Sequence, residues 1–484
     1  MAEAPSATST GAPSPAAALL VLADALAPLT ARFAEAGHEI ALVGGPVRDI
    51  MLGRPGVTHD LDLTTDAHPE RIEQLVRGWA DHVWDVGMRF GTVGARSGDL
   101  HLEITTYRSE SYDPESRKPE VTFGDSLAGD LARRDFTVNA MAVRLPTLEF
   151  VDLHDGMRDL QERILRTPIA PEESFGDDPL RMMRAARFVS QLDFSIAPEV
   201  LAAMCEMSSR LEIVSAERIR DELTKLLLGA HPRLGLAVLV ETGLATYVLP
   251  ELPGLKLEID EHHRHKDVYE HSLTVMEQAI DLETSHQPVS EPDLVLRLAA
   301  LLHDIGKPKT RRFEGDGGVS FHHHEVVGAR MVRKRLTALR YPNDVIDDVS
   351  KLTELHLRFH GYGTGEWTDS AVRRYVRDAG DQITRLHKLT RADCTTRNRK
   401  RAAALQAAYD GLEERIEILA AEEELAAIRP DLDGNRIMEI LGIRPGREVG
   451  EAYNYLLELR LDRGPLGQDE AERELRAWWA ARQA

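Results

Sequence analysis

Cysteine is scarce in this chain: Cys205 and Cys394 are the only two among 484 residues. Two cysteines cannot form the dense disulfide framework of a small secreted domain, so their scarcity favours a reducing compartment. Hydrophobic residues nevertheless make up 43% of the sequence, which is ample for folded cores. A chain of this length is expected to contain more than one domain.

We also find no long apolar run in the sequence: none approaches the roughly 20 residues that a membrane-spanning helix needs. Residues 1–16 are rich in Ala, Pro, Ser and Thr and lack a basic start. They are expected to form a disordered tail rather than a signal peptide. The sequence therefore predicts a soluble, cytoplasmic protein with no membrane partner.

Positive charge is the third deficit. The chain has 59 Lys and Arg against 80 Asp and Glu, which gives a formal net charge of −21. Taken alone, this balance disfavours a nucleic-acid partner. Basic stretches at 133–134, 181–187 and 397–401 could still line a local groove, so we expect modest, steeply salt-dependent binding of nucleic acid.

The pattern of apolar residues divides the chain into regions. Residues 38–165 mix short strands with short helices, which predicts an α+β unit with a small mixed sheet, and the pattern is helical from Pro179 onward. The predicted regions are a disordered tail at 1–16, an α+β head at 17–165, a helical neck at 166–256, a histidine-rich helical domain at 257–410 and a helical tail at 411–484. Within the head we expect a helix at 17–37, strands at Ile40–Val43, Leu61–Leu63, Leu100–Tyr107 and Glu149–Asp152, and a mobile loop at Ser109–Gly129.

A glycine turn followed by two aspartates is the most informative segment. After the apolar strand Ile40–Val43, Gly44 and Gly45 allow a sharp turn and a close backbone approach to a ligand such as phosphate. Asp60 and Asp62 are two residues apart on a strand, so their side chains share one face. Adjacent carboxylates repel unless a cation lies between them, which invites Mg²⁺. Either feature alone would be ordinary, but together they predict nucleotidyl transfer.

Five motifs, in order, resemble those of the class II tRNA nucleotidyltransferases, which are the CCA-adding enzymes and the related bacterial poly(A) polymerases. The motifs are Gly44-Gly-Pro-Val-Arg-Asp49, Asp60-Leu-Asp-Leu-Thr-Thr65, Glu103-Ile-Thr-Thr-Tyr-Arg108, Arg133-Arg-Asp-Phe-Thr-Val-Asn-Ala140 and Asp177-Asp-Pro-Leu-Arg-Met-Met-Arg-Ala-Ala-Arg-Phe188. The resemblance implies a polymerase-β-like head followed by all-helical neck, HD and tail regions. It also implies stepwise addition of C, C and A to tRNA from CTP and ATP, with release of pyrophosphate.

The resemblance assigns catalysis to three carboxylates. Asp60 and Asp62 would hold two Mg²⁺ ions that activate the RNA 3′-hydroxyl and stabilise the leaving pyrophosphate. Glu103 would aid the metals or accept the hydroxyl proton, although it could equally be a solvated residue on a strand. The implied nucleotide-binding residues are Gly44, Gly45, Arg48, Arg134, Asp135, Asn139, Asp178, Arg181, Arg184 and Arg187.

Some of these residues have more specific implied roles. Gly45 and Arg48 would meet the triphosphate, Arg134 the nucleotide and Asp135 the ribose. The alternative is that Arg133 and Arg134 are an ordinary pair of surface arginines.

Base selection would rest on Asp178 and Arg181. Cytosine and adenine both carry an amino group beside a ring nitrogen acceptor, so the carboxylate can accept from the one while the guanidinium donates to the other. Guanine and uracil present a carbonyl oxygen there instead and would be rejected. As alternatives, Asp178 before Pro179 is a helix N-cap, and the arginines at 181, 184 and 187 form one solvated basic face. Asp177 stands where the family usually has the longer Glu.

Two segments favour CCA addition over poly(A) addition. Gly91-Thr-Val93 resembles the CCA-adding type, because poly(A) polymerases carry an Arg-rich segment with His-Val before the third carboxylate's strand. The predicted loop 109–129 lies where the family places the element that helps switch from C to A addition.

The histidines form a second candidate site. His271, the pair His303-Asp304 and Asp393 follow the H…HD…D order, which resembles the HD phosphohydrolase superfamily. Imidazole and carboxylate ligands suit a divalent transition metal that activates water. The resemblance implies phosphatase or cyclic phosphodiesterase activity on RNA ends. Further histidines could add ligands, hold phosphate or form a loop cluster; these are His322, His323, His324 and His356.

The segment from Asp433 to Gly450 resembles the tail with which these enzymes grip tRNA. Three other functions remain open: a poly(A) polymerase, a metal-dependent phosphohydrolase whose head only binds nucleotide, and an RNA-binding scaffold. The sequence does not indicate an oligomeric state.

Overall fold

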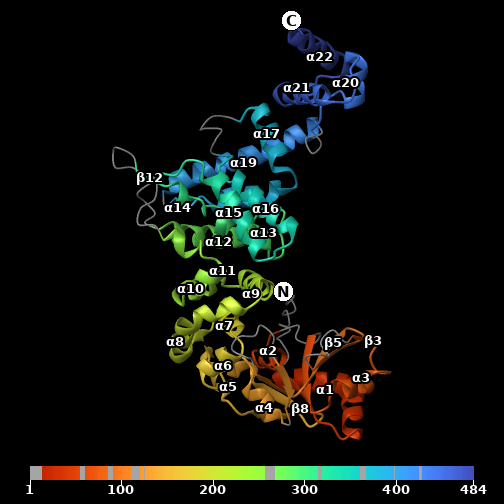
Figure 1. Ribbon diagram of the computed structural model, residues 1–484, viewed down its shortest axis with the longest axis vertical. Helices are drawn as coiled ribbons and strands as arrows, with labels where there is room; N and C mark the ends of the chain where they lie inside the picture. The colour runs from red at the N-terminus through yellow and green to blue at the C-terminus, as the bar shows by residue number, and fades with distance from the viewer. Residues whose placement is uncertain are drawn as a thin grey trace, which may run out of the picture. The chain divides into compact units, whose positions relative to one another are not determined.

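The computed structural model describes residues 14–54, 60–84, 91–111, 120–124, 126–256, 267–313, 319–359, 367–396, 398–423 and 428–483. The chain divides into two compact units, Met1–Val248 and Leu249–Ala484. The first unit combines a sheet with helices, whereas the second is almost entirely helical (Figure 1).

A seven-stranded mixed sheet with strand order β3-β4-β5-β2-β1-β8-β9 forms the head. Its strands are β1 (Ile40–Val43), β2 (Asp60–Thr65), β3 (His82–Trp84), β4 (Thr92–Ser97), β5 (Leu100–Thr106), β8 (Met141–Leu145) and β9 (Glu149–Asp152). Among these strands, β2 and β5 pair in parallel and every other pair is antiparallel. The four predicted strands match β1, β2, β5 and β9 within a few residues, whereas β3, β4 and β8 were not predicted.

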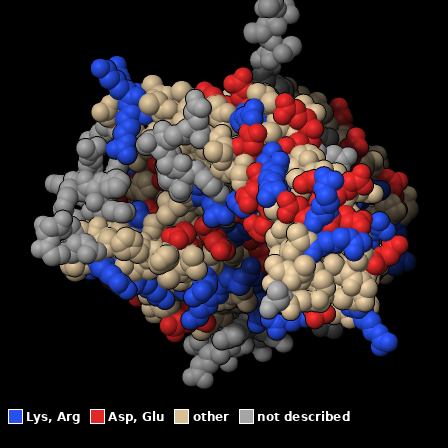
Figure 2. Space-filling view, turned by 90° about the horizontal axis from the view of Figure 1, so that it is seen from above, with Lys and Arg blue, Asp and Glu red and all other residues tan. Residues whose placement is uncertain are grey.

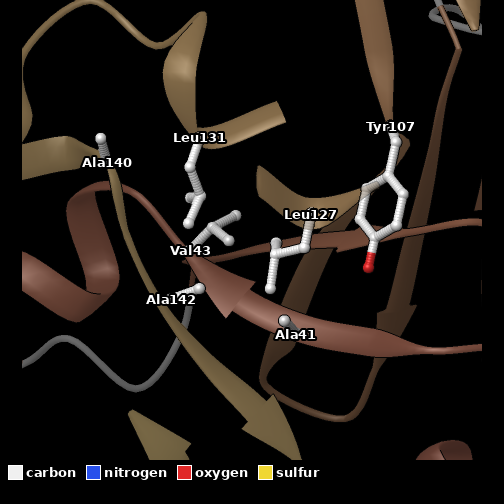
Figure 3. Packing of buried hydrophobic residues seen from close by; sticks show 7 residues of the cluster. All are labelled: Ala41, Val43, Tyr107, Leu127, Leu131, Ala140 and Ala142. Carbon is white, nitrogen blue, oxygen red and sulfur yellow. The ribbon is translucent and has the colours of Figure 1, made fainter. Parts of the chain in front are cut away.

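The head packs a helix closely on one face of this sheet. Strand side chains alternate between faces, so Ala41 and Val43 of β1 share a face, and α4 (Leu127–Ala132) places Leu127 and Leu131 over them (Figure 3). Small side chains on the strands allow the helix to approach. All four residues of β1 are buried, which means that both faces of the sheet are covered at its centre.

The loop predicted at 109–129 is wrong at both of its ends. The strand β6 (Arg108–Ser111) pairs antiparallel with β7 (Glu120–Phe123), and α4 begins at Leu127. Residues 112–119 and 125 lie outside the described part of the chain.

The first helix, α1 (Pro15–Glu35), is long and apolar enough to cross a membrane by length and composition alone, which corrects our reading that no segment approaches that size. It is packed on the head along one side, where Leu22, Leu26 and Phe33 are buried. Arg32 also donates to the backbone carbonyl of Arg77 at 2.8 Å, just beyond α3 (Pro69–Val76). Most of the predicted tail, residues 1–13, lies outside the described residues.

The neck of the first unit is helical. Helix α5 (Gly156–Glu162) ends the head, and the neck contains α6 (Pro171–Asp177), α7 (Leu180–Leu192), α8 (Pro198–Met207), α9 (Ala216–Leu227), α10 (Pro232–Glu241) and α11 (Ala245–Val248). Helix α7 packs against α9 and α10. A Cβ atom at Gly235 of α10 would lie 2.7 Å from the carbonyl oxygen of Ala186, so glycine at this position permits the close helix approach.

The second unit is built around α13, whose residues Val295 to Leu302 are all buried. Its helices are α12 (Val268–Ser285), α13 (Leu294–Leu302), α14 (Lys307–Thr310), α15 (His324–Ala338), α16 (Asn343–Leu355), α17 (Asp369–Ala379), α18 (Ile383–Ala392), α19 (Arg399–Glu422), α20 (Gly434–Leu441), α21 (Arg447–Arg463) and α22 (Gln468–Gln483). A short hairpin joins β12 (Arg312–Phe313) to β13 (Val319–Ser320). The last three helices share a small core of their own, which includes Ile437, Leu456 and Leu475.

Basic side chains are exposed on this acidic chain. On the face shown in Figure 2, basic and acidic side chains are interspersed. A net charge of −21 is therefore compatible with local basic surfaces.

Candidate active sites

Three carboxylates lie side by side on two strands of the head. Asp60 and Asp62 are on β2, and the parallel pairing sets Asp62 beside Glu103 of β5 and Asp60 beside His101. The intervening Leu61 is buried on the opposite face of the sheet. In-register neighbours point to the same side of a sheet, so Asp62 and Glu103 face one region.

The negative charges of these three carboxylates repel one another. Burial among neighbouring groups raises the pKa of Asp62, and the charges of Glu103 and Asp60 raise it further, while Arg134 and Arg184 lower it. The Asp60 side chain is 93% exposed. Clustered, accessible carboxylate oxygens are the donor set that Mg²⁺ binds together with substrate phosphates, so these residues fit the predicted metal.

The glycine turn lies directly against this group. Gly44 has φ +73°, a conformation that glycine adopts without strain, and a Cβ atom there would lie 3.0 Å from Nη1 of Arg134 and 3.6 Å from Oδ2 of Asp62. Gly45 begins α2 (Gly45–Met51). The absence of a side chain at residue 44 therefore keeps the backbone close to a carboxylate and a guanidinium.

Arg48 occupies a different environment from the one that its predicted phosphate contact suggests. Its guanidinium is largely buried and donates to both carboxylate oxygens of Asp49, at 2.9 and 2.8 Å, and to Oδ1 of Asn139 at 2.8 Å. In this arrangement Arg48 positions Asn139 and connects α2 to the segment that follows α4.

Asp135 is the centre of a buried network. It accepts from Nδ2 of Asn139 at 3.0 Å and from the backbone N–H of Phe136 at 2.8 Å, and Nη2 of Arg184 lies 2.8 Å away. Burial opposes ionisation, but Arg184 and these hydrogen bonds outweigh it and lower the pKa of Asp135. Arg134 is held separately by Asp130, at 3.0 Å.

The arginines of α7 do not form one solvated basic face, which corrects that alternative. Arg181 and Arg187 are 7% and 8% exposed. Arg187 pairs with Glu222 of α9 at 3.2 Å, and Arg181 donates to Oγ of Ser174 at 2.8 Å. Arg187 is buried because α9 packs along α7, whereas the side chain of Arg184, between Arg181 and Arg187 in sequence, is 37% exposed.

Asp178 and Arg181 are near in sequence but engage other partners. One Asp178 oxygen accepts from the backbone N–H of Leu180 at 3.1 Å, and the other lies 2.8 Å from Nη2 of Arg218. The helix N-cap is Pro179 rather than Asp178. Arg218 and Glu222 were missed in the sequence; their signal is two charges four residues apart on α9, next to its apolar face.

The predicted HD residues come together in the second unit. His271 projects from α12, His303 and Asp304 follow α13, and Asp393 follows α18. Oδ1 of Asp393 lies 3.1 Å from Nε2 of His271 and 3.6 Å from Nε2 of His303. Oδ2 of Asp304 lies 3.4 and 3.3 Å from the same two nitrogens. His271, His303 and Asp393 therefore form one candidate metal site.

A second candidate metal site adjoins the first through Asp304. Its other oxygen, Oδ1, lies 3.2 Å from Nε2 of His324 and 3.9 Å from Nε2 of His356, and these three residues form a separate ligand group. The neighbouring His322 and His323 are exposed. Of the additional histidines, the structure thus brings His324 and His356 into the site and leaves the other two outside.

The buried histidines are oriented as metal ligands are. In each of three, Nδ1 contacts the backbone carbonyl three residues earlier, which leaves Nε2 directed into the cluster. The pairs are His303 with Ala300 at 2.8 Å, His324 with Phe321 at 2.8 Å and His356 with Thr353 at 2.7 Å. Such an outer contact fixes the tautomer and orientation of ligating histidines. The nitrogen and oxygen donors fit divalent transition metals.

The carboxylates of this cluster are held ionised. Burial raises the pKa of Asp304, but His303, Lys307 and His324 bring it well below its usual range. Burial also lowers the pKa of His303, yet Asp304 and Asp393 outweigh it and raise that pKa to about 9. His356 is the opposite case, because burial lowers its pKa to about 3.

Family models match three consecutive parts of the chain. A Poly A polymerase head domain matches residues 40–166, a probable RNA and SrmB-binding site of polymerase A matches 193–255, and an HD domain matches 268–398. An A-adding tRNA nucleotidyltransferase of Deinococcus radiodurans is 34% identical over 451 residues, covering 91% of this chain and 95% of that protein. The chain belongs to the tRNA nucleotidyltransferase family. The predicted resemblance is thereby confirmed.

Other tRNA nucleotidyltransferases match over a shorter region. CCA-adding enzymes of Enterococcus faecalis and Levilactobacillus brevis are 42% and 43% identical, each over 48% of this chain. These matches span 59% and 57% of the relatives' own lengths.

Solved structures confirm the fold of this chain. The Bacillus stearothermophilus CCA-adding enzyme in complex with CTP superposes with a TM-score of 0.66 at 24% identity, covering 95% of this chain and 98% of that one. The Thermotoga maritima CCA-adding enzyme complexed with tRNA gives a TM-score of 0.57 at 19% identity, covering 95% of each chain. The α+β head followed by helical regions is thus the fold of this family.

Proposed function

We propose that the chain adds C, C and A in turn to the 3′ end of tRNA, using CTP and ATP and releasing pyrophosphate. The observation that carries this proposal is the in-register set of Asp60, Asp62 and Glu103 beside the Gly44 turn. CCA-adding relatives that are more than 40% identical over the corresponding half of the chain support it.

In this proposal each head residue has a defined task. Asp60 and Asp62 would hold Mg²⁺. When bound, its positive charge would activate the attacking hydroxyl and stabilise the leaving pyrophosphate. Glu103, next to Asp62 on the neighbouring strand, accepts the proton of the 3′-hydroxyl or completes the ligand set. Arg134, which lies against the Gly44 turn, neutralises the phosphate oxygens.

Base choice then falls to Asp178 and Arg181. Because Asp178 is engaged by Arg218 at 2.8 Å and Arg181 by Ser174 at 2.8 Å, a cytosine or adenine has to replace these contacts with its amino group and ring nitrogen. Guanine and uracil offer no amino donor to Asp178 at that edge. Their binding would leave Asp178 and Arg181 without hydrogen-bond partners, which costs a large amount of binding free energy at a partly buried site.

Addition of A alone is the second candidate function. The relative that matches 91% of this chain is named an A-adding enzyme, whereas the CCA-adding relatives match 48% of it. An A-adding enzyme would need a partner that supplies the two cytidines.

Two truncated tRNAs separate these candidates. With a tRNA that ends before the CCA sequence, we expect incorporation of two C residues from CTP, followed by one A from ATP, and no product from GTP or UTP. An enzyme that extends only tRNA already ending in CC, and only with ATP, would be A-adding. Long A tails would identify a poly(A) polymerase.

We also propose that the second unit hydrolyses phosphoesters on RNA ends with two divalent transition metals. The observation behind it is Asp304, whose two oxygens face separate ligand groups. When bound, the metals supply an activated water at neutral pH. Metal analysis of the purified protein is expected to give about two equivalents, and His356→Ala about one, with cyclic phosphodiester hydrolysis reduced in step. Unchanged metal content in His356→Ala would contradict the paired site.

Magnesium in the head and a cytoplasmic location, without a membrane partner, belong to the same proposal. Fractionation that places the native protein with tRNA-processing activity in the soluble fraction would support the location.

A further inference from the structure

An exposed basic segment begins three residues after Asp304. We call the residues of the two candidate metal sites the HD cluster; they are His271, His303, Asp304, His324, His356 and Asp393. Residues Lys307 to Phe313 read Lys-Pro-Lys-Thr-Arg-Arg-Phe and contain no acidic residue, in a chain of net charge −21. Lys309, Arg311 and Arg312 are exposed. Such a cluster of exposed cations favours a polyanionic ligand.

The segment ends on an exposed aromatic ring. Phe313 is 73% exposed, the highest value for a large hydrophobic side chain in the described part of the chain. The guanidinium of Arg311 lies 5.3 Å from the centroid of this ring. An exposed aromatic ring with arginine beside it is the combination on which nucleic-acid bases stack.

Both arms of the hairpin lead to metal ligands. On one side, Lys307 lies 2.8 Å from Oδ2 of Asp304, and the chain continues through α14 to β12. On the other side, Phe313 pairs with Val319 of β13, five residues before the ligand His324. Five residues span at most about 18 Å and paired strands lie about 5 Å apart, so Phe313 is at most about 23 Å from His324, a distance that a few nucleotides span.

We propose that Lys309, Arg311, Arg312 and Phe313 form a docking surface for the single-stranded 3′ end of an RNA, and that it presents the terminal phosphate to the HD cluster. The inference rests on the proposed hydrolysis and deepens it by naming residues that bind the RNA chain beyond its terminal phosphate. Charge complementarity selects this occupant over an apolar peptide, since a guanidinium lies beside the ring and further exposed cations precede it in the chain.

The first experiment compares two substrates of the holoenzyme. One is a 2′,3′-cyclic mononucleotide, and the other is a single-stranded RNA hexamer that ends in the same cyclic phosphate. Phe313→Ala is expected to raise KM for the hexamer by roughly 5- to 100-fold, the value of one stacked base, and to leave mononucleotide turnover unchanged. Phe313→Trp should retain wild-type KM, and Phe150→Ala, at a 39% exposed ring elsewhere, should change neither substrate.

The cationic part of the surface has a distinct signature. Arg312→Ala should weaken hexamer binding uniformly across base sequences and reduce the salt dependence of binding by about one counterion. Equal losses for mononucleotide and hexamer, or no loss for either, would overturn the docking surface.

A second measurement separates failure of this inference from failure of the hydrolase proposal. If neither substrate is hydrolysed by wild-type protein, the hydrolase proposal has failed, and docking is then read from the tryptophan fluorescence of Phe313→Trp minus that of wild type. Quenching by the hexamer supports docking. No quenching overturns it, and a response to anionic phospholipid vesicles but not to RNA would assign the surface to a membrane instead.

Discussion

The two candidate active sites hold their ligands in opposite ways. In the head, carboxylates stand on adjacent strands, and the Asp60 side chain is 93% exposed. In the second unit, Asp304 is 2% exposed and is surrounded by histidines already oriented by backbone carbonyls. The exposed carboxylates of the head suit a metal that binds together with a nucleoside triphosphate. The enclosed ligands of the second unit suit metals that remain bound between reaction cycles. The difference follows from the elements: a sheet surface leaves its ligands open, whereas packed helices enclose theirs.

Metal removal gives the largest expected difference between the sites. Brief EDTA treatment followed by gel filtration should lower nucleotide addition by at least about 100-fold, on the scale of losing one strong electrostatic stabiliser, and added Mg²⁺ should restore it at once. Hydrolysis should survive the same treatment because its ligands are buried. Measuring both activities and the retained metal tests this; loss of the HD metals as fast as Mg²⁺ would contradict the contrast.

Removing one central aspartate from each site should affect stability differently. Asp304→Ala leaves the buried His303 with Asp393 as its one remaining carboxylate partner and removes the carboxylate beside Lys307, so the second unit should lose about 3–5 kcal/mol of unfolding free energy. Asp62→Ala relieves repulsion from Asp60 and Glu103 and should leave the first unit as stable as before, or more so. Calorimetry of the metal-free full chain measures both; a large destabilisation by Asp62→Ala would show that the head carboxylates are structural.

Crowding at the glycine turn can be separated from backbone strain. Gly44 and Gly53 both have positive φ, +73° and +66°, but a Cβ atom would crowd Arg134 at Gly44 and meet nothing within 4 Å at Gly53. Gly44→Ala should therefore reduce nucleotide addition by about 10²-fold, the scale of a small misplacement of catalytic groups. Gly53→Ala also places a side chain at a residue with positive φ, without the contact to Arg134, and should retain activity. Equal losses in steady-state assays would assign the effect to strain alone.

The smallest predicted effect concerns a histidine of the second unit that is not a metal ligand. Burial lowers the pKa of His387 to about 4, despite the charge of Glu413. Its folded pKa is below the unfolded value of about 6.5, so the unfolded state binds more protons and stability falls as the pH drops from 6.5 towards 4. The expected loss is about 2 kcal/mol between pH 7 and pH 5.

His387→Phe supplies the control for that pH dependence. The ring of His387 stacks on Tyr375 at 5.7 Å with an interplanar angle of 11°, and phenylalanine can keep that stacking without titrating. Denaturant unfolding at both pH values should show the acid-dependent loss only in wild type. An identical loss in the variant would assign it to other groups.

Much of the head could be predicted because its signals are local. The apolar run at Ile40–Val43 and the alternation around Asp60 and Asp62 identify β1 and β2 without tertiary information. The strand β4 was missed because Gly94 and Arg96 interrupt its apolar pattern. The placement of Glu103 beside Asp62 depends on a parallel register between distant segments, which no local pattern specifies.

The environments of charged residues were harder to predict than their presence. The arginine spacing on α7 was visible, but the pairing of Arg187 with Glu222 depends on the packing of α9. Likewise, the sequence offered four further histidines near the HD motif, and the fold alone selects His324 and His356. Domain boundaries and the individual roles of site residues stay predictions.

The most direct test of the central claim is CMP incorporation into a tRNA that lacks its CCA end by the double variant Asp60→Ala/Asp62→Ala, with its HD residues intact. We predict no incorporation while cyclic phosphodiester hydrolysis continues at the wild-type rate. Incorporation that persists in this variant would contradict the assignment of nucleotidyl transfer to the head carboxylates.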